Sequence, residues 1–448
     1  MITIEVEPLD VNTYERQDVF DGLMGLLTDI TCGALSSLIS DALDDEVTYR
    51  LQRGPRVPRE QSSGVVVPWA CHRCGETSAS ELKRNGHYRR GLQTTRGTVV
   101  GLRVPMVRCR RCGAAADIEF AAVRKHKQLW LDVEVEVMFA YGAEEGLRHI
   151  AQRVGRQLGW PVSASTIQNR VHGFESALTQ WRERVIADPP DVLMLDGIWF
   201  STMQATGECG TDRKGRRRPV QKRIKRVALI ALGLWSDSGR KQILDFEIAD
   251  SEEEGNCLPL LNRLHWRGVT DGHLQLVVSD GAGGLCAAIE TVYPTVARQR
   301  CVFHKLKNVG DHLRDKTHRK AILEAACWIY DASNPREAHA RLEHFVMTWQ
   351  GEEPEAVTSL RADFEASIAY LSPLHLEQPR RYRTTNAMEG GVMRPLRRTL
   401  DRATAFRSAT GAQVGLFLAM ARLNATQRDT PWVYETDDII TMLYNSKP

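Results

Sequence analysis

Hydrophobic and polar positions divide the chain into helical and strand-like parts. From residue 17 to 53, apolar residues recur at helical spacing and no proline interrupts them. A second helical pattern runs from 129 to 171. Between 191 and 303, short apolar runs alternate with turn residues, which predicts the strands of a mostly buried sheet. The pattern is helical again over 305–376 and 385–424. We therefore expect an α/β core with helical regions around it.

The length of 448 residues is too great for one small core, so several domains are expected. The pattern divides the chain into a helical N-terminal region, a cysteine-containing module, a helical region, the first part of the α/β core, an all-helical stretch, a last core helix and a C-terminal tail. The predicted boundaries, in that order, are 1–60, 69–120, 129–185, 190–304, 305–380, 381–425 and 426–448.

The composition indicates a globular protein, because 42% of residues are hydrophobic and 26% are charged. No uninterrupted run of 18 apolar residues occurs, which predicts that no segment spans a membrane. The first 20 residues are acidic and lack the apolar stretch of a signal peptide. We therefore expect a cytoplasmic protein.

The net charge of +3 hides a strongly basic segment from Arg213 to Arg226, which contains no acidic residue. Clustered positive charge over a near-neutral total is typical of proteins that bind phosphate backbones. The alternative is a set of solvated loops. The candidate DNA contacts in this segment are Arg213, Lys214, Arg216, Arg217, Arg218, Lys222 and Arg223.

Two CxxC pairs, each followed by glycine, stand out among the ten cysteines. A zinc–thiolate site needs four soft ligands arranged tetrahedrally, and two such knuckles provide them. We predict a zinc ribbon in which Zn²⁺ is structural, because four thiolates leave no open coordination position. His72 and His87 are alternative ligands, and four unliganded thiols are the alternative interpretation. The predicted ligands are Cys71, Cys74, Cys109 and Cys112.

Residues 145–155 and 163–171 have the pattern of two short helices joined by a turn. Ser163 is a candidate N-cap of the second helix. Side chains projecting from that helix are suited to base edges and phosphates, so the segment resembles a helix-turn-helix. An ordinary helical hairpin is the alternative. The candidate DNA contacts are Gln168, Asn169 and Arg170.

Two aspartates occupy equivalent positions in the predicted sheet. Asp196 and Asp280 each end an apolar run and are each followed by glycine. A carboxylate at the end of a buried strand is costly unless its charge is compensated. Two of them in the same setting indicate a shared cation. Carboxylate oxygens suit Mg²⁺ or Mn²⁺, so we predict a divalent-metal site.

Two sequence blocks carry a family resemblance. Residues 298–308, RQRCVFHKLKN, and 383–398, RTTNAMEGGVMRPLRR, resemble blocks of the Mutator-type transposases of bacterial insertion sequences. The first holds a CxxH motif and the second surrounds the family's third acid. With the two aspartates in matching order, the resemblance covers about residues 190–425. The glycines after Glu389 depart from the pattern, which has a bulkier helical continuation there.

The resemblance implies an RNase H-like mixed sheet with an all-helical insertion before the third acid. It also implies that Asp196, Asp280 and Glu389 form a catalytic DDE triad. Glu365 and Glu377 are weaker candidates for the third acid, because neither lies in a comparable block.

A second implication concerns the residues beside the triad. Cys301 and His304 would be an accessory motif that contacts DNA near the cleavage point. The basic helix after the third acid would neutralise phosphates, and its candidate contacts are Arg394, Arg397 and Arg398.

The implied function is DNA transposition by two-metal-ion phosphoryl transfer. Such an enzyme cleaves the ends of its element and joins the 3′-hydroxyls to target DNA. Its partners would be double-stranded DNA, namely terminal inverted repeats and a target, and it would work as a homodimer or larger assembly. Two alternatives are a catalytically inactive or domesticated DNA-binding regulator and an RNase H-like nuclease without strand transfer.

Overall fold

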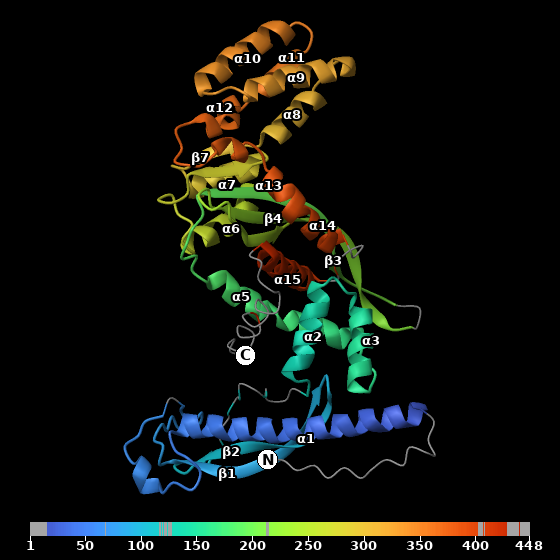
Figure 1. Cartoon of the computed structure of the whole chain (residues 1–448), viewed down its shortest axis with the longest axis vertical. Helices are drawn as coiled ribbons and strands as arrows, with labels where there is room; N and C mark the ends of the chain where they lie inside the picture. The colour runs from blue at the N-terminus through green and yellow to red at the C-terminus, as the bar shows by residue number, and fades with distance from the viewer. Residues whose placement is uncertain are drawn as a thin grey trace. The chain divides into compact units, whose positions relative to one another are not determined.

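The computed structural model divides the chain into two compact units (Figure 1). Unit 1 comprises Met1–Tyr141 and Glu145–Arg170, and unit 2 comprises Gly142–Glu144 and Val171–Pro448. The structure describes residues 16–67, 69–115, 118, 120, 123, 128–211, 215–401, 406, 408–427 and 439. Two of the predicted DNA contacts, Arg213 and Lys214, and nearly all of the predicted tail lie outside the described residues.

Unit 1 is built on a long helix and a hairpin. Helix α1 (Arg16–Leu51) packs against β2 (Gly97–Cys109), which pairs antiparallel with β1 (Leu82–Thr94). The apolar face of α1, including Leu43, is buried in one core with Leu102 of the hairpin. Three further helices follow: α2 (Leu131–Gly142), α3 (Leu147–Leu158) and α4 (Ala164–Gly173).

Part of α1, Met24–Leu51, is long and apolar enough, by length and composition alone, to cross a membrane. A count of uninterrupted apolar residues does not detect this helix, because polar residues interrupt its apolar ones. The same helix carries charged contacts with the hairpin: Asp44 pairs with Arg84 at 3.3 Å, and Asp41 pairs with Arg103 at 3.8 Å. These ion pairs fit a helix lying on a protein surface.

Unit 2 contains a mixed five-stranded sheet in the order β5-β4-β3-β6-β7. The first three strands form an antiparallel meander, and β6 and β7 run parallel to β3. Helix α6 connects β5 to β6, and α7 connects β6 to β7. The bounds are β3 Val192–Thr211, β4 Arg217–Leu234, β5 Lys241–Ala249, α6 Glu254–Trp266, β6 Leu276–Ser279, α7 Gly283–Val292 and β7 Ala297–Arg300.

Strands β3 and β4 are much longer than the apolar runs that predict them. Asp196 is therefore the fifth residue of a 20-residue strand, not the end of a strand as expected. Likewise, Arg217–Arg226 belongs to β4, so this part of the basic segment is not a loop. Both strands extend beyond the sheet, where they are exposed on both faces and show no alternation of apolar and polar residues.

Helices enclose the sheet of unit 2. Leu261 of α6 and Ile289 of α7 are buried against Leu193 and Leu229 of the central strands. Two other helices, α5 (Glu175–Glu183) and α15 (Ala409–Gln427), pack together, and α15 also lies against β5.

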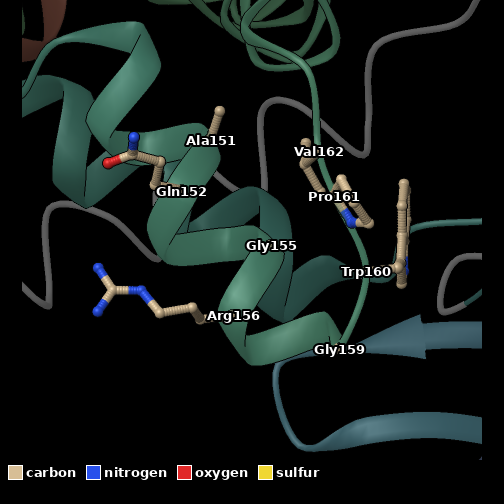
Figure 2. A pocket seen from close by; sticks show the side chains of 8 residues that line it. All are labelled: Ala151, Gln152, Gly155, Arg156, Gly159, Trp160, Pro161 and Val162. Carbon is tan, nitrogen blue, oxygen red and sulfur yellow. The ribbon is translucent and has the colours of Figure 1, made fainter.

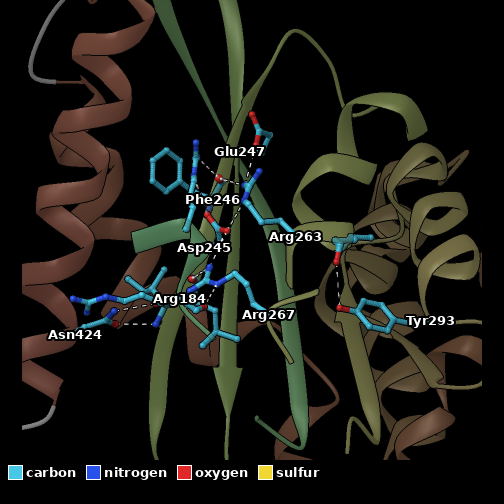
Figure 3. Close-up of polar contacts among 12 residues, drawn as sticks. Arg184, Asp245, Phe246, Glu247, Arg263, Arg267, Tyr293 and Asn424 are labelled. Carbon is cyan, nitrogen blue, oxygen red and sulfur yellow. Dashed lines mark hydrogen bonds and ion pairs between the residues drawn. The ribbon is translucent and has the colours of Figure 1, made fainter. Parts of the chain in front are cut away.

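The outer edge of β5 is covered by a side chain from α15. The Asn424 amide donates to the Ile243 carbonyl at 2.9 Å, and its oxygen accepts from the Ile243 N–H at 2.8 Å (Figure 3). These bonds satisfy backbone groups that an edge strand otherwise leaves open.

A buried aspartate in β5 ties this strand to two helices. Asp245 is fully buried, and its carboxylate pairs with Arg263 at 2.7 Å and Arg267 at 3.0 Å (Figure 3). Arg182 of α5 lies 3.4 Å from the same carboxylate. A buried carboxylate is stable only when such partners compensate its charge.

Every element between β7 and the residues around Glu389 is helical. Ile322, Ile329 and Phe345 belong to a separate apolar core within this stretch. Its elements are α8 Val302–Asp311, α9 Arg319–Tyr330, α10 Pro335–Trp349, α11 Pro354–Arg361 and α12 Phe364–Ser367, with short 3₁₀ turns at Lys316–His318, Ala369–Leu371 and Pro379–Tyr382. The chain then forms α13 (Asn386–Met388), a π-helical turn (Glu389–Met393) and α14 (Arg394–Asp401).

Candidate active site

Acidic and basic side chains line a cleft of about 450 Å³ in unit 2, beside the central strand β3. Its carboxylates are Asp196, Glu252, Asp280 and Glu389, and its basic side chains are Arg300, His304, Lys307 and Arg397. The cleft thus brings together the three acids of the predicted triad, the histidine of the CxxH motif and one predicted arginine.

Asp196 lies deepest, with 8% of its surface exposed. The Gly197 N–H donates to its Oδ1 at 2.8 Å. Burial raises the pKa of Asp196 to about 6, and the charges of Asp280 and Glu389 act in the same direction, while His304 opposes them. The charged form of Asp196 is therefore costly in the protein alone.

Asp280 follows β6, and its Oδ1 accepts from the Ala282 N–H at 3.0 Å. Gly281 beside it has φ of 91°, and a Cβ at this position would lie 2.6 Å from Nε of Arg300. A side chain here would thus require both a strained backbone and displacement of Arg300. The lack of space beside Arg300 therefore explains why a glycine follows Asp280.

Glu389 starts the π-helical turn between α13 and α14, and the two glycines that depart from the family pattern lie within this turn. π-Helical turns are rare and frequent at functional sites. The rival acids lie elsewhere: Glu365 pairs with His339 at 3.0 Å, and Glu377 is exposed. Neither lines the cleft.

Among the described residues, no lysine or arginine forms an ion pair with Asp196, Asp280 or Glu389. Arg300, although it lines the cleft, pairs with Asp363 at 2.5 Å. The cleft therefore gathers carboxylates whose charge the protein does not compensate by direct pairing. Such a set of oxygen donors fits divalent cations.

Cys301 connects the segments that carry the second and third acids. Its N–H donates to the Ser279 carbonyl at 2.7 Å, next to Asp280. Its fully buried Sγ accepts from the Thr385 N–H at 3.3 Å, four residues before Glu389. Cys301 itself does not line the cleft.

His304, one turn further along α8, does line the cleft. Its interaction with the Cys301 thiol raises the pKa of the imidazole, burial opposes this, and the charges of Asp196 and Asp280 raise it further. His304 therefore stays protonated to higher pH than an ordinary histidine.

Glu252 is a cleft residue that the sequence did not identify. Burial and the charge of Asp280 raise the pKa of the Glu252 carboxyl. The Trp199 side chain donates a hydrogen bond to this carboxyl, which opposes the shift. A Cβ at Gly197 would lie 2.6 Å from its Oε1, so that glycine leaves room for the carboxylate. In sequence, Glu252 is one of three successive glutamates, and nothing distinguishes it from Glu253 and Glu254.

The predicted basic contacts are distributed over two elements of unit 2. On α14, Arg397 reaches the cleft, and Arg394 and Arg398 are exposed. Arg216 precedes β4 and is exposed, and the exposed residues of β4 include Arg217, Arg218, Lys222 and Arg223.

The four predicted zinc ligands converge in unit 1, with all sulfur atoms within 4.8 Å of one another. The Cys71–Cys112 and Cys74–Cys109 sulfur distances are 3.6 Å and 3.7 Å. Tetrahedral coordination at a Zn–S distance of about 2.3 Å requires about 3.8 Å between sulfurs. The group can therefore hold a metal such as zinc.

The two knuckles around these cysteines have matching backbone geometry. Gly75 donates to the Cys71 carbonyl at 2.8 Å, and Gly113 donates to the Cys109 carbonyl at 2.9 Å. Both glycines have positive φ, which lets the chain fold around the sulfurs. The alternative ligand His87 instead bonds Asp44 at 3.0 Å.

The helix-turn-helix candidate is a helical hairpin of α3 and α4. Ser163 Oγ accepts from the Thr166 N–H at 3.0 Å and so caps α4 as expected. Asn169 is exposed and Gln168 half-buried, but Arg170 does not project freely, because it pairs with the largely buried Glu134 at 3.2 Å.

A hollow of about 540 Å³ lies at the turn of this hairpin (Figure 2). Gln152 and Arg156 of α3 line one part of it, and Trp160 and Pro161 of the turn line another. Gly155 lets the turn approach α3, because a Cβ there would lie 3.0 Å from the Trp160 carbonyl.

Comparisons with known proteins agree with the sequence blocks. The transposase of ISRM5 from Rhizobium meliloti is 30% identical over 316 residues, which cover 70% of this chain and 73% of that protein. The transposase of IS905 from Lactococcus lactis is 28% identical over 62% of this chain and 64% of its own length. The IS256 transposase of Tn4001 from Staphylococcus aureus is 26% identical over 70% and 74%.

Among solved structures, the Drosophila P element transposase strand transfer complex matches 70% of this chain and 92% of its own, with a TM-score of 0.25 and 10% identity. That similarity is too low to support a conclusion. The profile of the family described as "Transposase, Mutator family" matches residues 70–416, most of the chain. The chain therefore belongs to the Mutator family of transposases.

Proposed function

We propose that this protein is a DNA transposase that cleaves the ends of its element and joins the 3′-hydroxyls to target DNA by two-metal-ion phosphoryl transfer. The carrying observation is the cleft that gathers Asp196, Asp280 and Glu389, none of which pairs with a lysine or arginine of the described residues. Family membership supports the reaction class.

The proposed core is RNase H-like, with an all-helical insertion. The mixed sheet in the order β5-β4-β3-β6-β7 supports this assignment, as does the purely helical stretch between β7 and Glu389. This arrangement places Asp196 on the central strand and Asp280 after its parallel neighbour. The two aspartates thereby share one side of the sheet.

We assign two Mg²⁺ or Mn²⁺ ions to the three acids. Asp196, the most buried, would contribute to holding both ions, and Asp280 and Glu389 would each contribute to one. When bound, such ions activate the attacking oxygen and stabilise the leaving oxygen. The residues fit this role, because a carboxylate with its pKa raised to about 6 by burial becomes stable in its charged form beside a cation.

The remaining cleft residues act on the DNA strand. Protonated His304, Lys307 and Arg397 face the place where a phosphate must lie and neutralise its charge. Cys301, through its bonds to Ser279 and Thr385, holds the segments of the second and third acids in register.

The proposed partner is double-stranded DNA, both terminal inverted repeats and target. The relatives are transposases of insertion sequences, which supports this substrate. We assign DNA contacts to Gln168 and Asn169 of α4, and to Arg394 and Arg398 of α14. Because two element ends must be held together, we propose that the protein works as a homodimer or larger assembly.

We propose that the four cysteines hold a structural Zn²⁺ in a ribbon. The sulfur spacing near that of a tetrahedral site supports this. Elemental analysis of the purified protein should find one zinc per chain. Cys112→Ser should lose the zinc and expose unit 1 to proteolysis, whereas Cys209→Ser, at an exposed cysteine outside the cluster, should change neither.

A strand-transfer assay with Mg²⁺, element-end DNA and a plasmid target tests the reaction. The proposal expects cleaved ends and joined products. Cutting without joining would instead indicate a nuclease, and no cutting by the wild type would indicate a DNA-binding regulator. Asp280→Asn should lower the rates of cleavage and joining by about 10³-fold or more. Several kcal/mol of transition-state stabilisation depend on the ion that Asp280 would hold.

A further inference from the structure

Beyond the sheet, β3 and β4 continue as a two-stranded ribbon, which we name the basic ribbon: residues 203–211 of β3 and 217–225 of β4. Strand β5 pairs with β4 only from Val227 onward, and β6 pairs with β3 only as far as Met194. The basic ribbon is therefore exposed on both faces through most of its length.

Phe406 anchors the base of the basic ribbon, whereas most of the ribbon is exposed. The Phe406 N–H donates to the Ser201 carbonyl at 3.0 Å, and the Met203 N–H donates to the Phe406 carbonyl at 2.7 Å. The rings of Phe200 and Phe406 meet edge to face at 6.1 Å. A free hairpin is only marginally stable, so this anchor gives the ribbon a fixed origin in the catalytic unit.

Positive charge lies on both faces of the ribbon. Side chains alternate along β4, so Lys222 lies on one face and Arg223 and Lys225 lie on the other. No acidic side chain in the described part of the chain pairs with these three. A ribbon resting on a single phosphate backbone needs charge on one face, whereas one with a phosphate strand at each side needs charge on both. The charge pattern therefore favours insertion into a groove.

The dimensions of the ribbon agree with a DNA groove. The major groove is about 12 Å wide and admits a two-stranded β-ribbon. Three residues of β3, 206–208, oppose a single residue of β4, Val220, and Gly207 among them has φ of 85°. Such a bulge bends a ribbon and increases its twist, which lets it follow a curved groove.

The ribbon also has a fixed distance from the catalytic acids, because Asp196 lies on the same strand. Met203 is 7 residues and Thr211 is 15 residues beyond Asp196. Measured along the strand at about 3.3 Å per residue, these positions lie roughly 23 Å and 50 Å from Asp196. With about 3.4 Å per base pair, DNA running along the ribbon would be contacted roughly 7 to 15 base pairs from the cleaved phosphate.

We propose that the basic ribbon enters the major groove of one arm of the bound DNA, about 7 to 15 base pairs from the cleavage point. This inference rests on the proposed function and adds to it a specific DNA-binding element. The ribbon sets the length of duplex that the enzyme requires on that arm.

The test compares a ribbon variant with a matched control. Lys222→Ala, Arg223→Ala and Lys225→Ala are combined in the variant. The control combines Lys241→Ala, Lys316→Ala and Lys320→Ala, three exposed lysines outside the ribbon. Binding of full-length protein to element-end duplex is measured over a range of salt concentrations. The ribbon variant should lower the salt-dependence slope by about 3, at about 0.9 per lost phosphate contact.

Two further readouts locate the contact. Methylation of guanine N7, which lies in the major groove, should interfere with wild-type binding about 7 to 15 base pairs from the cut on one arm and should not affect the variant there. Shortening that arm to about 5 base pairs should reduce wild-type binding to the level of the variant. Both proteins should then cut the short substrate equally.

An unchanged salt slope and interference pattern in the ribbon variant would overturn the proposal. So would loss of self-association with unchanged DNA affinity, because the ribbon would then pair with a second copy of the chain. Thermal unfolding of the variant should match the wild type, since the changed side chains are exposed. If the wild type bound DNA through the ribbon but never cut it, the proposed function would fail while this inference stood.

Discussion

Two buried aspartates of the same sheet have opposite surroundings. Asp245 on β5 is fully buried and has Arg182, Arg263 and Arg267 around its carboxylate. Asp196 on β3 is 8% exposed, and its charged neighbours include two further acids of the cleft. The protein compensates the first charge with three arginines, whereas among the described residues no lysine or arginine pairs with the second.

The difference is the one expected between a structural charge and the metal-binding charge proposed for Asp196. The arginines around Asp245 bond β5 to helices α5 and α6 and leave its carboxylate no room for a ligand. The cleft around Asp196 is open and carries raised pKa values at Asp196 and Glu252. Perturbed acids in a cleft mark a functional site. Each half of the comparison can be tested by removing a charge.

The largest effect is expected at the compensated site. Asp245→Asn leaves the buried Arg267 and the half-buried Arg182 and Arg263 without this carboxylate and should lower the free energy of unfolding by about 3–5 kcal/mol. Urea denaturation measures this change. Asp250→Asn is the control at the end of the same strand: Asp250 is 71% exposed and pairs with Arg226, so its loss should cost about 1 kcal/mol or less. Equal effects of the two variants would contradict the comparison.

At Asp196, removing the charge should raise the free energy of unfolding rather than lower it. The folded-state pKa of Asp196 is raised to about 6 from 3.8, so ionisation opposes folding. Below pH 3.8 both states are protonated and the penalty is absent; it grows as pH rises and is complete above pH 6. Without metal, Asp196→Asn should therefore stabilise the protein by up to about 3 kcal/mol above pH 6, with little effect near pH 4.

Urea denaturation in EDTA across pH 4–8 measures this difference. Saturating Mg²⁺ should shrink or invert it, because only the wild type gains stability from the bound ions. A destabilising Asp196→Asn at pH 7.5 in EDTA would show that Asp196 is compensated within the protein after all.

The smallest effect is expected at Glu252, the fourth acid of the cleft. Glu252→Gln removes a charge beside Asp280 and should raise the Mg²⁺ concentration for half-maximal cleavage about fivefold, which corresponds to about 1 kcal/mol in a partly exposed site. Titration of cleavage rate against Mg²⁺ measures it. Glu253→Gln, at the exposed neighbour, should leave the titration unchanged. An equal shift in both variants would show that the effect comes from the overall charge of the protein and not from a carboxylate in the cleft.

The sequence predicted the features that local chemistry determines. The CxxC spacing and its glycines indicated the cysteine cluster, because each knuckle is a short-range structure. The apolar runs before Asp196 and Asp280 indicated two acids on one sheet, because a buried strand is recognisable as a short run of apolar residues between turn residues. Glu389 came from the family resemblance alone, since its π-helical turn has no such signature.

Other features depend on distant parts of the chain. Glu252 faces the cleft because the segment after β5 brings its carboxylate beside Gly197, and its two acidic neighbours in sequence hide it. The sequence predicts no strand in the ribbon, because an exposed strand has no alternation of apolar and polar residues. The ion pair of Arg170 with Glu134 likewise joins residues 36 positions apart.

The central claim is that the uncompensated acids bind divalent ions. Calorimetric titration of Mn²⁺ into the full-length protein with element-end DNA tests it most directly, with Asp280→Asn beside the wild type and Asp237→Asn, at an exposed turn, as control. We predict two ions per chain for the wild type and the control, at most one for Asp280→Asn, and unchanged zinc in all three. Identical Mn²⁺ binding by Asp280→Asn and the wild type would contradict the account.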